Sequence, residues 1–140
     1  MGRVIALDVG TKTIGVAMSD PMRMLASPVT TIRRKGVRRD TDVIAAMIEE
    51  RGVDHVVVGL PFELDGTEAR PARLARQIGE EVKARTGLPV DYVDERYSSV
   101  DAERQLIAAD VSRARRKEII DQAAAVIIME SWMRMQAYSS

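Results

Sequence analysis

The stretch that decides the fold is RVIALDVGTKTIGVAMS, residues 3–19. Its two apolar runs, 3–8 and 13–19, are separated by Gly10-Thr11-Lys12, a spacing that predicts a β-hairpin. Asp8 ends the first run. A carboxylate at the end of a buried strand needs a cation or hydrogen-bond donors to offset the cost of its burial. Asp8 therefore either accepts hydrogen bonds from its own turn or binds a ligand, and acidic residues later in the chain favour the ligand.

The remaining apolar runs predict further strands and helices. A third run over 24–32 contains Pro28, so we expect it to bend or to lie on a sheet edge. A helical stripe over 41–51 predicts a helix, with Asp40 as its N-cap and Gly52 just past its end. Further strands are expected at 56–58 and 90–93, and further helices at 68–86, 99–109 and about 115–138.

This order predicts an α/β fold with a five-stranded mixed sheet. Three antiparallel strands come first, parallel strands joined by helices follow, and helices cover both faces. The 140 residues suit a single domain spanning 1–140. Because sites in such sheets form beyond the carboxyl ends of strands, Asp8 and the pair Asp94-Glu95 are expected at a common edge.

The composition narrows the chemistry. The chain has 21 Lys plus Arg and 21 Asp plus Glu, so its net charge is zero. The overall charge therefore does not indicate a polyanionic partner such as nucleic acid. The chain has no Cys, which excludes disulfides and thiol catalysis, and its single His, His55, argues against a His-centred triad or a His-rich metal site. No run approaches the ~20 apolar residues of a membrane span, so a cytoplasmic protein without membrane contact is expected.

Carboxylates from three elements form the candidate site. Side chains alternate along a strand, so Asp94 and Glu95 point to opposite faces and one of them faces Asp8. Asp121 opens the apolar segment 121–129 and lies beyond the helical turn that the dipole stabilises. Oxygen ligands without His or Cys suit Mg²⁺ or Mn²⁺. Two such ions can promote phosphodiester hydrolysis.

Four sequence blocks in order resemble a known family. They are LDVGTKTIGVAMSD at 7–20, VGLP at 58–61 followed by DGT at 65–67, DER at 94–96 and IDQAA at 120–124. The chain resembles the YqgF family, also called RuvX, of Holliday-junction resolvases also described as pre-16S rRNA nucleases. The resemblance spans nearly the whole chain and implies an RNase H-like fold. It also implies that Asp8, Glu95 and Asp121 are the catalytic, metal-binding acids.

The chain departs from RNase H-like resolvases at the fourth strand, where they carry an acid. Here the strand ends in Val58-Gly59-Leu60. The second carboxylate must then come from the fifth strand, with Glu95 expected and Asp94 as its competitor.

Basic residues near the acids are expected to contact nucleic acid, because a polyanion needs neutralising groups. Lys12 and Arg96 lie within the family motifs, and Arg115, Arg116 and Lys117 precede Asp121 on its helix. The cluster at 33–39 is expected to be a solvated surface.

The leading hypothesis is a metal-dependent nuclease that acts in 5′ processing of pre-16S rRNA, on branched DNA, or on both. One alternative is a non-catalytic nucleic-acid-binding accessory. Another is a nucleotide-binding protein, since Asp8-Val9-Gly10-Thr11 looks like the first phosphate loop of the actin, Hsp70 and sugar-kinase superfamily. The apolar positions at 129–135 are expected in the core, with a homodimer face as the alternative.

Overall fold

The structure, a computed structural model, describes residues 2–61, 70–94 and 113–139. The helix expected over 99–109 lies outside these ranges. The elements in chain order are β1 (Arg3–Val9), β2 (Thr13–Ser19), β3 (Ala26–Arg33), α1 (Val37–Arg51), β4 (Val53–Leu60), α2 (Arg70–Thr86), β5 (Val90–Asp94) and α4 (Arg113–Ser139).

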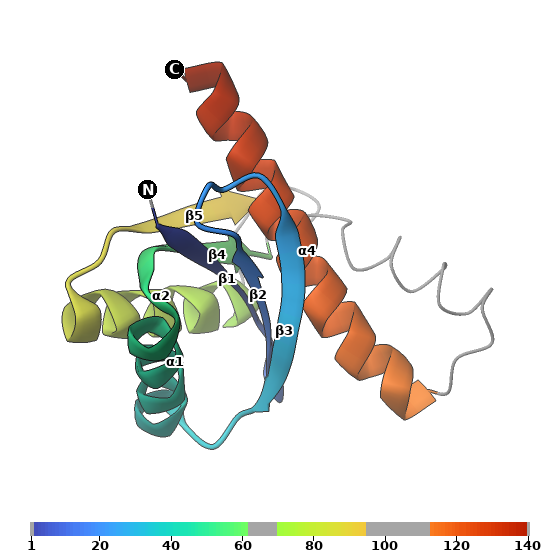
Figure 1. Cartoon of the computed structure of the whole chain (residues 1–140). Coiled ribbons are helices and arrows are strands. Elements are labelled where there is room, and N and C mark those ends of the chain that lie inside the picture. Colours follow the sequence, from blue (N-terminus) through green and yellow to red (C-terminus); the bar gives the residue numbers. More distant parts are fainter. Residues whose placement is uncertain (1, 62–69, 95–112, 140) are drawn as a thin grey trace.

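The strands form one five-stranded sheet in the order β3-β2-β1-β4-β5 (Figure 1). β1, β2 and β3 are antiparallel neighbours, whereas β4 is parallel to both β1 and β5. The mixed sheet predicted from the sequence is confirmed. β3 lies at an edge, and its register against β2 shifts near Pro28, so the prediction for the third run is also confirmed.

Helices cover both faces of the sheet, with α1 and α2 on one side and α4 on the other (Figure 1). Alternate residues of β1 divide between two cores. Ile5 and Leu7 pack in the cluster that contains α1 and α2, whereas Val4 and Ala6 pack against α4. Asp8 has the parity of Val4 and Ala6, so its side chain belongs to the α4 face.

The start of α1 differs from the prediction that Asp40 is its N-cap. The helix begins at Val37 after Gly36, and Asp40 is a buried residue of its first turn. The Asp40 carboxylate accepts hydrogen bonds from the Arg34 side chain and the Lys35 backbone N–H, each at 3.0 Å. These donors precede the helix, so the carboxylate braces the β3–α1 junction. The other end agrees with expectation, because Gly52 ends α1 in the left-handed conformation.

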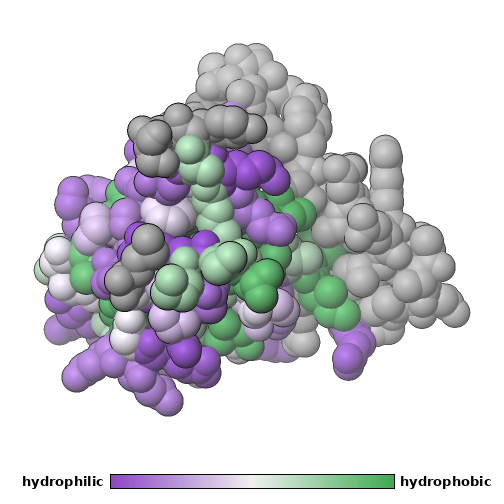
Figure 2. All heavy atoms as spheres, turned by 45° about the horizontal axis from the view of Figure 1, so that its top comes forward, coloured by the Kyte–Doolittle hydropathy of each residue, from purple (hydrophilic) through white to green (hydrophobic). Residues whose placement is uncertain are grey.

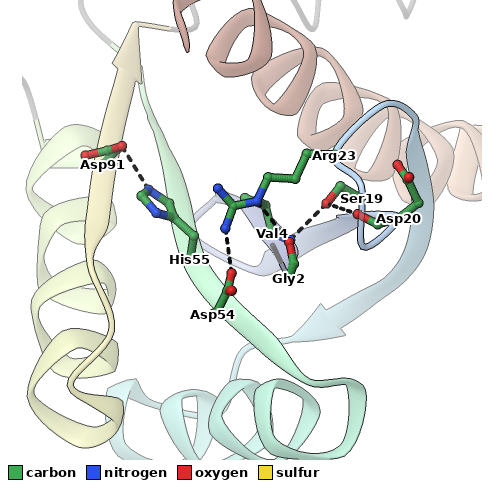
Figure 3. Close-up of polar contacts among 8 residues, drawn as sticks. All are labelled: Gly2, Val4, Ser19, Asp20, Arg23, Asp54, His55 and Asp91. Carbon is green, nitrogen blue, oxygen red and sulfur yellow. Dashed lines mark hydrogen bonds and ion pairs between the residues drawn. The ribbon is translucent and has the colours of Figure 1, made fainter. Parts of the chain in front are cut away.

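A polar cluster fixes the C-terminal half of α4 to β4 and β5. Trp132 on α4 donates its indole N–H to the Asp91 carboxylate at 2.8 Å, and a ring nitrogen of His55 lies 2.9 Å from the same oxygen. Figure 3 shows the pairing of His55 with Asp91. Burial raises the pKa of Asp91, but the hydrogen bonds from Trp132 and His55 and the His55 charge outweigh it and lower the pKa overall. The only histidine is thus engaged in packing between strand and helix.

Arg23 holds the β2–β3 loop against the same region. Its guanidinium donates to the Gly2 carbonyl and pairs with Asp54, as Figure 3 shows, and it lies 5.7 Å from the centre of the Trp132 ring. Arg23 itself has a positive φ of 58°. Its neighbours in the loop point outward, which leaves three large apolar side chains exposed: Met22, Met24 and Leu25.

This end of the molecule comes forward in Figure 2, where apolar groups form a strip among hydrophilic side chains. Of the helices in the described ranges, none combines the length and apolar character that a bilayer crossing requires.

α4 crosses β2 at a point of backbone contact. A methyl group built on Gly15 would lie 3.1 Å from the Asp121 Cα and would overlap the carbonyl group of Asp121. Ala124 and Ala125, one turn further along α4, are buried at the same interface. Small side chains on both elements therefore permit the close approach that sets the position of Asp121.

We expect Gly15→Ala to destabilise the protein by about 3 kcal/mol, because backbone cannot move aside as a side chain can. Chemical denaturation monitored by Trp132 fluorescence measures the change. An unchanged free energy of unfolding would show that α4 does not need this contact.

Candidate functional site

Asp8 and Asp121 meet beside Gly15. Asp8 directly opposes Gly15 in the β1–β2 ladder, where paired Cα atoms are about 4.5–5.5 Å apart. The backbone of Asp121 lies against the same glycine from the α4 side. Since the Asp8 side chain also belongs to the α4 face, both acids predicted from the sequence lie on one side of the sheet, at the carboxyl end of β1.

The carboxylate of Asp121 is buried and held in place. Asp121 is 8% exposed, and its Oδ2 accepts a hydrogen bond of 2.5 Å from the Thr13 hydroxyl. The next residue, Gln122, donates from its side-chain amide to the Thr31 hydroxyl at 3.1 Å. These bonds tie α4 to the first residue of β2 and to β3, so the Asp121 side chain has a fixed orientation.

Sequence reasoning missed Thr13. The signal was present, because Thr13 and Gly15 are two residues apart on β2 and must share a face. What the sequence lacked was the knowledge that α4 crosses this face at Gly15.

The structure separates Asp94 from the other acids. Asp94 is exposed and opposes Leu60 across the β4–β5 ladder. It has the parity of Tyr92, which packs with the α1 and α2 cluster, whereas Val93 packs in the α4 cluster. Asp94 therefore belongs to the face opposite Asp8 and Asp121. Glu95, the acid predicted from the sequence, lies outside the described residues.

Two of the three expected acids are thus brought together. In ranges 2–61, 70–94 and 113–139 there is no group of three or more acidic, His or Cys side chains arranged to hold a metal ion.

The predicted basic contacts are partly placed. Lys12 is exposed in the β1–β2 turn beside Asp8, and Arg115 is exposed on α4 before Asp121. Arg96 and the side chains of Arg116 and Lys117 lie outside the described part of the chain.

The basic segment 33–35 reaches the same turn, which the sequence analysis did not expect. The Arg34 backbone N–H donates to the Lys12 carbonyl at 2.9 Å, and its guanidinium donates to the Gly10 carbonyl at 3.1 Å. The strand order expected from the sequence already contained this information. Because the third strand runs antiparallel to β2, it must end beside the start of β2, and residues 33–35 follow directly.

The strand order, the helices on both faces and the acids at the end of β1 define an RNase H-like protein. Two solved structures share this fold. A structure of T. thermophilus RuvC in complex with a Holliday junction substrate aligns with a TM-score of 0.57 at 16% identity, covering 96% of both chains. A Fowlpox virus resolvase complexed with Holliday junction DNA aligns with a TM-score of 0.59 at 13% identity, covering 96% of this chain and 98% of that one.

Sequence comparison identifies the family. Residues 2–135 match the family described as "RuvX: Holliday junction resolvase". A protein of Myxococcus xanthus named "Putative pre-16S rRNA nuclease" is 45% identical over 131 residues, 94% of this chain and 87% of the relative. A protein of the same name from Clostridioides difficile is 47% identical over 132 residues, 94% of each chain. The chain belongs to the RuvX family and is a nuclease, a hydrolase of phosphodiester bonds.

We expect Thr13→Val to lower cleavage about 10-fold and to raise the divalent-ion concentration needed for half-maximal activity. The variant keeps the β-branched shape but removes the donor that orients Asp121, and outer partners of this kind are typically worth about 10–100-fold. Initial cleavage rates across an ion titration provide the measurement.

Thr30→Val is the matched control, because Thr30 opposes Val16 and belongs to the other face of the sheet. Equal rates and equal ion dependence for Thr13→Val and the wild type would remove Thr13 from the site.

Proposed function

We propose that the chain is a divalent-metal-dependent nuclease whose catalytic acids are Asp8, Glu95 and Asp121. One observation carries this proposal: Asp8 and Asp121, distant in sequence, converge on Gly15 on the same face of the sheet. Glu95 is preferred to Asp94 as the third acid because Asp94 belongs to the opposite face.

The donors available fit a hard cation. Asp8 and Asp121 offer carboxylate oxygens, the chain contains no Cys, and His55 is engaged with Asp91 and Trp132. Oxygen-only ligands suit Mg²⁺ or Mn²⁺. A pair of bound ions supplies activation of the attacking water and stabilisation of the leaving oxygen.

The chain's own residues do the remaining work in this proposal. Thr13 keeps the Asp121 carboxylate oriented. Lys12 and Arg115, exposed near the acids, are proposed to bind substrate phosphates together with Arg96, Arg116 and Lys117. Such cations offset the repulsion between clustered carboxylates and a polyanion.

For the substrate we propose nucleic acid, and in particular the 5′ region of pre-16S rRNA, because both curated relatives carry that name. Branched DNA is the second candidate, favoured by the family description. A non-catalytic accessory and a nucleotide-binding protein are weaker alternatives, since neither requires two acids from distant elements on one face.

A cleavage panel decides among these substrates. It comprises precursor rRNA, four-way junction DNA and linear single strands, each with Mg²⁺, Mn²⁺ or EDTA. Metal-dependent cleavage of precursor rRNA at its 5′ region is the expected result. Binding without cleavage of any substrate would favour the accessory, and cleavage of junction DNA alone would favour the resolvase.

We also propose that residues 1–140 form a single domain. We propose that the protein acts in the cytoplasm, where precursor rRNA is processed, and that it forms a homodimer. Met129 and Trp132 of the face considered from the sequence are buried in the core, so Met22, Met24 and Leu25 offer the exposed apolar surface for it instead. Sedimentation of the intact chain distinguishes dimer from monomer.

We expect Asp8→Asn and Asp121→Asn each to reduce cleavage by about 100-fold or more while the fold survives, because an amide keeps the shape but loses the ligand charge. Cleavage rates and circular dichroism are measured on the same preparations. Glu95→Gln should behave in the same way.

Asp94→Asn is the control and should cleave at nearly the wild-type rate. Full activity in Asp8→Asn or Asp121→Asn would reject the three-acid site, and loss of activity in Asp94→Asn but not in Glu95→Gln would reverse the choice of the third acid.

A further inference from the structure

We infer that a cleft at the β3–α1 junction binds a backbone phosphate of the nucleic acid a few nucleotides away from the bond that is cleaved. The inference rests on the proposed nuclease function and assigns a substrate-binding surface to residues that the family motifs do not include. Three basic residues line the cleft, Arg33, Lys35 and Arg39.

The cleft has a net positive charge that is open to solvent. Its two acidic residues are already engaged: Asp40 accepts from Arg34 and the Lys35 N–H, and Asp42 pairs with Arg85. Across the described ranges, no carboxylate forms an ion pair with Arg33, Lys35 or Arg39. All three side chains are exposed.

The start of α1 adds to this charge. The helix begins at Val37, directly beside the cleft, and its N-cap Gly36 has no side chain to accept from the first backbone N–H groups. The positive end of a helix attracts anions. Arg38, in the same turn, is also exposed.

The cleft lies at the same end of the sheet as the candidate acids. Arg33 opposes Thr13, the residue that holds Asp121, and Arg34 is bonded to Lys12 and Gly10 in the turn that follows Asp8. β3 is two strands away from β1, which is about 10 Å. Ile32 in the lining packs with the α1 and α2 cluster, so the cleft lies on the other side of the sheet from Asp8 and Asp121, with the edge strand β3 between them. A nucleic-acid strand cleaved near Asp8 would therefore pass around β3 to place a phosphate a few nucleotides away in the cleft.

The residues that line the cleft also indicate which part of a nucleic acid it binds. Among the residues that the structure describes, the uncharged members of the lining are Ile32 and Val43 and none is aromatic, so these residues offer no platform for base stacking. Lys and Arg side chains contact phosphate without reading sequence. The cleft should therefore bind RNA and DNA backbones alike.

The test compares a cleft variant, Lys35→Gln with Arg39→Gln, with a control, Arg51→Gln with Lys83→Gln. Both remove one Lys and one Arg. Arg51 and Lys83 are exposed in the last turns of α1 and α2, at the opposite end of the sheet. Fluorescence anisotropy with labelled single-stranded RNA and DNA of one sequence is measured in EDTA over a range of salt concentrations, so binding is observed without cleavage.

We expect the cleft variant to bind both probes more weakly and to show a log Kd against log salt slope shallower by about 1.4, from ~0.7 per phosphate contact on single strands. The control should match the wild type, and melting temperatures should agree for all three proteins. Arg39→Glu should enlarge the loss.

Equal slopes for the cleft variant and wild type would overturn the inference and leave the nuclease proposal standing, because that proposal is judged by the cleavage of Asp8→Asn. Equal losses in the cleft and control variants would also overturn it, since they would show a general charge effect. A loss for one probe but not the other would contradict backbone recognition.

Discussion

The contact between the α4 backbone and Gly15 is the constraint on which the candidate site depends. Glycine has no Cβ, so the helix can lie against β2 at Asp121. Asp8 is the cross-strand partner of the same glycine. A side chain at position 15 would push α4 away from β2 and so separate the two acids, whether or not a ligand or substrate is bound.

The long C-terminal helix is held at two places, and two fixed points define its axis. Near the acids, Thr13 bonds Asp121 and Thr31 bonds Gln122. Further along, the Trp132 indole donates to the Asp91 carboxylate. Buried small and apolar side chains fill the interval between them. The position of Asp121 is therefore set by packing along the whole interface and not by its own turn alone.

A chain of zero net charge can still serve a polyanion if its charges are segregated. Asp121 is buried, whereas Lys12 and Arg39 are exposed near the same end of the sheet. Asp40 shows why counting charges along the sequence is insufficient. It lies among five basic residues, yet it is occupied internally by Arg34 and the Lys35 backbone.

The sequence by itself determined the hairpin, the mixed sheet and the sheet edge at which Asp8 lies, because apolar runs and short turns are local properties of the chain. It also determined the oxygen-only donor chemistry. It misplaced the start of α1 because Asp40 accepts hydrogen bonds from residues before the helix instead of capping it. Only the tertiary structure decided that Thr13 orients Asp121, that Asp94 faces away and that the 33–39 cluster adjoins the site. Each of these three features depends on how elements that are distant in the sequence pack together, and the local periodicity of apolar residues carries no information about that packing.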